Sequence, residues 1–195
     1  RALLIFEQWI NNHTTQPWFA LNDFDLRVVE KYDAFNIDPS FNLVPPGKGY
    51  EVNAWFLDDW RPLSAEEIER GSKIFRWQRD ELLAGLTTLD SELLTKAHPE
   101  ERWDIIGIAK HIANAELWYL QRMDLTPITH KDLSANHDIR LEQTAKLINK
   151  VFPCFVNQTQ VKGIDGEFWS YRKILRRILW HQRNHIDHIK KLAFG

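Results

Sequence analysis

The sequence predicts a mainly α-helical protein, with a four-helix bundle over residues 61–195 and a small N-terminal appendage over residues 1–60. Two observations support this prediction. Apolar residues recur at helical spacing in four segments after residue 61, and the breaks between these segments contain proline or glycine. Amphipathic helices joined by short to moderate connections are typical of a bundle.

The appendage is predicted to be one helix followed by two strands. Apolar residues at positions 3, 6, 9 and 10 indicate a short amphipathic helix over residues 1–12. Phe24–Val28 and Tyr50–Ala54 alternate apolar and polar residues, as strands with one buried face do. Such a segment is too small to be stable alone, so we expect it to pack on the rest of the chain or on residues upstream of Arg1.

Each helix of the predicted bundle has a local start or stop signal. Ser64, with a glutamate three residues later, forms a capping box that starts the first helix. Asp104 is the expected N-cap of the second helix. The third helix should begin near residue 135 and stop at Pro153, and the fourth should follow Ser170.

Composition excludes several classes of partner. The net charge of −2 and the pI of about 6.5 give no general attraction to nucleic acid. No apolar run approaches the roughly 20 residues of a membrane span. Cys154 is the one cysteine, so no intramolecular disulfide can form, and we expect a cytoplasmic protein in which Cys154 is a buried or partly buried structural thiol.

Histidines near the end of the chain are the main indication of chemistry. His181, His185 and His188 stand at i, i+4 and i+7, within an arc of about 60° on one helical face. The i, i+4 pair can reach one ion, and His111, on the inward face of the second helix, can supply a third ligand. The sequence therefore predicts a divalent transition metal, such as Zn, Ni or Fe, on His111, His181 and His185. The alternative is a hydrogen-bonded histidine cluster without metal.

Two further residues are candidates for moving protons. His188 is predicted to be an alternative ligand, a hydrogen-bond donor behind the ligands or a substrate-facing base. Glu116 stands at the edge of the inward face of its helix, where a solvated carboxylate is the alternative to a catalytic one.

The remaining polar residues are predicted to be solvated. His13, His98, His130 and His137 lack ligand spacing. The basic pairs at 172–173 and 176–177 are predicted to be the wet face of the last helix, with steering of an anionic thiol as the alternative. Trp180 lies on that helix away from the histidines, and we expect the N-terminal segment or a second subunit to cover it. The alternative is a single exposed tryptophan without a role.

Residues from about 64 to 192 resemble the DinB-like, or YfiT-like, superfamily of bacterial four-helix bundles. The resemblance rests on one histidine in the second helix, within Trp103–Trp118, and on the His-x-x-x-His pair within Trp180–Ile189. It implies a divalent metal on His111, His181 and His185. It also implies a thiol S-transferase or a hydrolase whose substrate is a small molecule, such as a low-molecular-weight thiol. The first third of the chain lies outside this match and resembles the closing helix and strand of a HicB-like domain.

The sequence departs from the superfamily pattern at one position, and a function other than catalysis is also compatible with it. Several relatives carry glutamine where this sequence has His188, so we expect a different substrate pocket. The alternative to an enzyme is a non-catalytic metal-binding or stress-related interaction protein with a structural histidine cluster, and a homodimer is compatible with either. An open coordination position would favour the enzyme, and a fourth protein ligand would favour the alternative.

Overall fold

The computed structural model describes residues 2–195 and divides the chain into two compact units, residues 1–33 and 34–195. The first unit contains α1 (Ala2–Asn11) and a 3₁₀ helix (Leu21–Asp23), so the helix predicted over residues 1–12 is confirmed. The strand predicted over Phe24–Val28 is wrong. Val28 is 78% exposed, and no strand occurs between residues 2 and 33 for this segment to pair with. The resemblance of this region to a HicB-like domain therefore has one predicted strand fewer to rest on.

Residues 34–60 belong to the second unit, although the sequence predicted a division near residue 60. They form a three-stranded antiparallel sheet of order β2-β1-β3 and then a 3₁₀ helix, Leu57–Trp60. The strands are β1 (Asn36–Ile37), β2 (Leu43–Val44) and β3 (Tyr50–Glu51), so the strand expected at Tyr50–Ala54 is shorter than predicted. Buried Asp59 ties this segment to the helices, because its carboxylate accepts from Arg176 at 2.6 Å.

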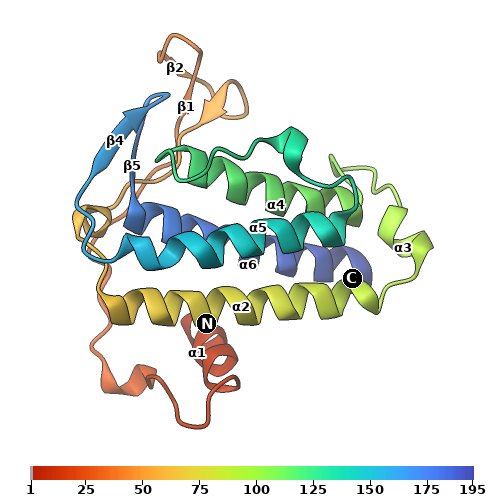
Figure 1. The fold of residues 1–195 in the computed structure, drawn as a ribbon, viewed down its shortest axis with the longest axis horizontal. Helices are drawn as coiled ribbons and strands as arrows, with labels where there is room; N and C mark the ends of the chain where they lie inside the picture. The colour runs from red at the N-terminus through yellow and green to blue at the C-terminus, as the bar shows by residue number, and fades with distance from the viewer. Residues whose placement is uncertain (1) are drawn as a thin grey trace. The chain divides into compact units, whose positions relative to one another are not determined.

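The four predicted helices form the bundle, which confirms the mainly α fold. They are α2 (Ala65–Thr87), α4 (Ile105–Gln121), α5 (His137–Val151) and α6 (Tyr171–Phe194). In Figure 1, α2 and α6 run in one direction and α4 and α5 in the other, so the connection between α4 and α5 returns along the bundle. The α4–α6 pair is in close contact, and the candidate metal centre lies on this pair.

Shorter elements fill the connections. The short helix α3 (Ser91–Thr95) lies between α2 and α4, and a 3₁₀ turn (His130–Asp132) precedes α5. After α5 the chain continues through Pro153 as a 3₁₀ helix, Phe152–Phe155, and then forms the antiparallel hairpin of β4 (Val161–Ile164) and β5 (Glu167–Ser170). The sequence predicted no strands between the third and fourth helices of the bundle.

Local capping explains where the helices begin. Ser64 accepts from the backbone N–H of Glu67, and the Glu67 carboxylate accepts from the backbone N–H of Ser64, as the capping box requires. Asp104 caps α4, and Ser170 caps α6 by accepting from the backbone N–H of residue 173. These predicted caps are confirmed.

The bundle interior consists of two apolar clusters with a polar layer between them. One cluster contains Phe75 and Ile178, and the other contains Leu82 and Ile186. Each of the four helices has a buried polar residue between its contributions to the two clusters. These residues include Arg79, Glu116, Thr144 and Gln182. Hydrogen bonds join these four, so the layer fixes how the helices face one another. No helix within residues 2–195 is long and apolar enough to cross a membrane.

Candidate metal centre

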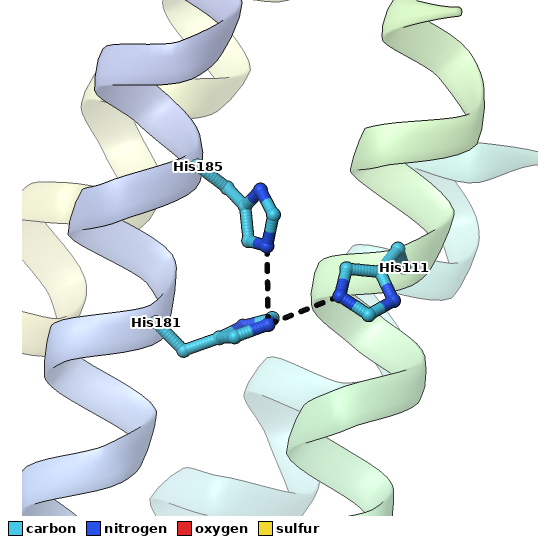
Figure 2. A group of neighbouring side chains, drawn as sticks. All are labelled: His111, His181 and His185. Carbon is cyan, nitrogen blue, oxygen red and sulfur yellow. Dashed lines mark hydrogen bonds between the residues drawn. The ribbon is translucent and has the colours of Figure 1, made fainter. Parts of the chain in front are cut away.

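Three histidines from two helices converge on one point between α4 and α6. Figure 2 shows His111 on α4 and His181 and His185 on α6, with their Nε2 atoms directed toward one another. The Nε2 atom of His181 lies 3.1 Å from that of His111 and 3.1 Å from that of His185. One ligand atom from each residue lies within 4.8 Å of the other two, so this group has the spacing to hold a metal ion.

The chemistry of these donors fits a transition metal better than hydrogen bonds alone. Zinc–nitrogen bonds of about 2.0–2.1 Å in a tetrahedron place two nitrogens roughly 3.3 Å apart, close to the 3.1 Å observed. A ring nitrogen of neutral imidazole either carries a hydrogen or offers one lone pair. The Nε2 of His181 therefore cannot fully satisfy both neighbours by hydrogen bonding, whereas one ion between the three nitrogens satisfies all of them.

Aromatic packing holds two of the three rings. Trp103 stacks on His111 with ring centroids 4.6 Å apart, and Tyr119 meets His181 edge-on at 5.9 Å. Gly107 makes the first contact possible, because a Cβ at this position would lie 2.7 Å from the Cβ of Trp103. Trp103, which lies just before the N-cap of α4, therefore folds back over the start of the helix and stacks on His111.

The environment keeps the imidazoles neutral. Burial, and then the neighbouring histidines, lower the pKa of His181 to about 2. Burial followed by the charge of nearby histidines lowers the pKa of His185 to about 4, and burial also lowers the pKa of His111. Neutral imidazole is the ligand form, so the site requires no loss of protons at pH 7. The Nδ1 atoms of His181 and His185 are buried and lack a partner within residues 2–195, so packing rather than a hydrogen bond orients these rings.

His188 lies beside the centre but outside the converging group. Its Nε2 is 3.0 Å from the Glu101 carboxylate, and its ring centroid is 6.1 Å from that of His185. Sequence reasoning missed Glu101, because it lies in the loop before α4 and no spacing relates it to α6. The carboxylate fixes the orientation of the His188 ring, which suits a group that transfers a proton.

Glu116 occupies a different environment from the solvated one considered above. Its side chain is fully buried, forms an ion pair with Arg79 and accepts from the Thr144 hydroxyl at 2.6 Å. No local pattern indicates this burial, because the partner cation comes from α2. Glu116 belongs to the polar layer of the bundle, and its catalytic role stays a prediction.

The basic residues at the start of α6 are not a wet face, which corrects the prediction. Lys173 is fully buried, and three of the four cations form ion pairs with carboxylates from elsewhere in the unit. The pairs are Arg172 with Glu67 at 2.8 Å, Lys173 with Glu167 at 3.5 Å and Arg176 with Asp59 at 2.6 Å. These contacts attach the N-terminal end of α6 to the start of α2, to β5 and to the 3₁₀ helix before α2.

Other predicted side chains also lie differently. Cys154 is exposed rather than buried, because the 3₁₀ helix that contains it turns its neighbours Phe152 and Phe155 inward instead. His13 and His130 are exposed as predicted, whereas His98 and His137 are partly buried. Trp180 is 53% exposed.

Comparison with known proteins gives a distant relative. No family model matches the chain, and no solved structure matches it. A curated protein of Oceanobacillus iheyensis named "Putative metal-dependent hydrolase" is 23% identical over 150 residues. The alignment covers 66% of this chain and 86% of that protein.

Proposed function

We propose that this chain is a metal-dependent hydrolase of a small molecule, with a divalent transition metal such as Zn, Ni or Fe on His111, His181 and His185. The observation that carries the proposal is the convergence of three neutral Nε2 donors at metal-ligand spacing. The O. iheyensis relative, named for metal-dependent hydrolysis, supports the same reaction class. The same histidine pattern supports our proposal that the chain belongs to the DinB-like or YfiT-like superfamily.

The ligand set favours catalysis over a purely structural site. Within residues 2–195 the converging group contains three donors and no fourth, and a three-ligand site leaves a position for water or substrate. A divalent ion in such a site supplies Lewis acidity toward a carbonyl or phosphoryl oxygen and lowers the pKa of water. The non-catalytic alternative predicts a closed structural site, which would need a fourth protein ligand.

The residues around the ligands have separate roles. His188, oriented by Glu101 at 3.0 Å, is the group we assign to carry a proton between solvent and substrate. Trp103 shields His111 on one side, and Tyr119 borders His181 on the other. Homodimer formation and a cytoplasmic location remain predictions.

The test compares metal-loaded and chelator-treated protein, purified without an affinity tag, on esters, amides and phosphoesters. We expect hydrolysis that depends on the metal, and we expect His181→Ala to lose both the metal and the activity. His130→Ala, which removes an exposed histidine outside the centre, should keep both. The same protein is given a low-molecular-weight thiol with an electrophile. Thiol transfer without hydrolysis would replace the proposal by its S-transferase alternative, and less than a tenth of an equivalent of metal after reconstitution would refute both.

A further inference from the structure

One arginine beside the histidines has no carboxylate partner among the described residues. Arg177 precedes His181 by one helical turn on α6, and no ion pair to it is found within residues 2–195, unlike its three basic neighbours. Its Nε atom is buried without a partner in the described chain, and its Nη2 donates to the Tyr119 hydroxyl at 3.2 Å. A partly buried cation is normally paired, so this guanidinium has unused capacity to bind an anion.

Aromatic contacts hold that guanidinium in a fixed position. Its Cζ atom lies 4.5 Å from the ring centroid of Trp180 and 5.7 Å from that of Tyr119. Contacts of this kind engage the flat face of a guanidinium and leave the in-plane N–H donors available. The Tyr119 ring also touches the His181 ring, so the unpaired donors lie next to the metal ligands. The exposed Trp180 ring therefore has a role within a single chain, because it supports the guanidinium of Arg177.

A second unpaired arginine flanks the other side of the centre. Arg102 stacks on Trp103 at 4.6 Å, and Trp103 stacks on His111 at 4.6 Å. No carboxylate pairs with Arg102 in the part of the chain that the structure describes, where the neighbouring Glu101 is engaged by His188. Two cations therefore border a ligand set that is itself neutral.

We propose that the candidate metal centre takes a small-molecule substrate with an oxyanion, a carboxylate or a phosphoryl group, which Arg177 and the Tyr119 hydroxyl bind. The proposal rests on the proposed function for the location of the reaction. Three neutral imidazoles leave the charge of a divalent ion uncompensated, and Arg177 and Arg102 add to it, so an anion is the favoured occupant. The planar fork of arginine matches the two oxygens of such a group.

The position of the anion follows from the contacts of Tyr119. Its hydroxyl accepts from Arg177, and its ring meets the His181 ring edge-on. The substrate anion is therefore expected between the guanidinium and the metal ligands.

The test measures calorimetric binding of benzoate and phenyl phosphate to chelator-treated and to zinc-loaded protein, with benzamide as the uncharged probe. We expect at least one anion to bind both forms and benzamide to bind neither. Arg177→Gln should weaken anion binding at least tenfold, and Arg177→Lys should weaken it less. The matched control is Arg70→Gln, which removes an exposed arginine paired with Glu66 on α2 and should change binding less than twofold.

The outcomes separate this proposal from the proposed function. Anion binding that Arg177→Gln abolishes supports the anion site even if the protein takes up no zinc, which would refute only the metal centre. Equal binding by Arg177→Gln and the unsubstituted protein, or no binding of either anion, overturns the anion site even if zinc binds stoichiometrically. Circular dichroism and the unfolding midpoint of each variant establish that the changes are not due to misfolding.

Discussion

Replacing Glu116 by alanine tests whether this carboxylate is structural or catalytic. The Arg79 side chain, 5% exposed, would keep its hydrogen bonds to the Gln182 side chain at 2.8 Å and to the Leu141 carbonyl at 2.7 Å, but it would lose its counter-charge. The Thr144 hydroxyl would lose the acceptor at 2.6 Å. A buried cation without an anion is therefore the main consequence.

The expected loss in the free energy of unfolding is large. Removal of one partner from a buried ion pair costs about 3–5 kcal/mol, whereas an exposed pair contributes about 0–1 kcal/mol. Glu66→Ala, which breaks the exposed pair with Arg70, is the matched control and should cost less than about 1 kcal/mol. The double variant Arg79→Met with Glu116→Leu should recover most of the loss, because it removes both charges.

Urea unfolding followed by circular dichroism measures these differences, and metal content and activity are measured on the folded fraction of each variant. We expect Glu116→Ala to lower stability and to keep its metal content and its activity per bound metal. A variant that keeps its stability within about 1 kcal/mol but loses activity would contradict the structural role and restore Glu116 as a catalytic group.

Three other predictions concern the periphery. Hydrogen bonding from Arg172 lowers the pKa of Glu67 from 4.5 to about 2, so its contribution is full above pH 4.5 and is lost as the pH falls toward 2. Glu67→Gln should therefore lower stability by about 1 kcal/mol at pH 7 and have no effect near pH 2, as measured by urea unfolding. Gly49→Ala should cost about 1–3 kcal/mol, and more than Gly47→Ala. Both glycines have positive φ, but only at Gly49 would a Cβ collide with the carbonyl oxygen of Ile37 in β1, so equal thermal shifts for the two variants would contradict this prediction. Exposed Cys154 should react with a disulfide reagent almost as fast in the native protein as in urea, and a hundredfold slower native reaction would refute its exposure.

The bundle could be predicted from sequence because its signals are local. The capping box at Ser64, the cap at Asp104 and the apolar period each lie within a few residues of the feature they determine. The convergence of His181 and His185 follows from helical spacing alone. The prediction of His111 as the third ligand needed only the further assumption that the inward faces of the two helices meet. The pairing of these faces across α4 and α6 is what the structure adds.

The rest could not be predicted, because it depends on contacts between distant residues. Alternation over residues 24–28 indicated a strand, but a strand needs a partner, and none occurs in that part of the described chain. The charges at the start of α6 suggested a solvated face, yet buried Lys173 meets Glu167 from the hairpin before it and Asn53 from before α2. Nothing local distinguishes Arg177 from Arg176, although within residues 2–195 only Arg176 of the two has a carboxylate partner.

The most direct test of the central claim is X-ray absorption spectroscopy of the zinc-loaded protein. We predict three imidazole nitrogens at about 2.0–2.1 Å, with the remaining coordination supplied by a light non-protein atom. His181→Ala should bind zinc weakly and show fewer imidazoles, while His130→Ala should give the unchanged spectrum. A spectrum of the unsubstituted protein with one imidazole or none, or with sulfur from Cys154 in the coordination sphere, would contradict the three-histidine centre.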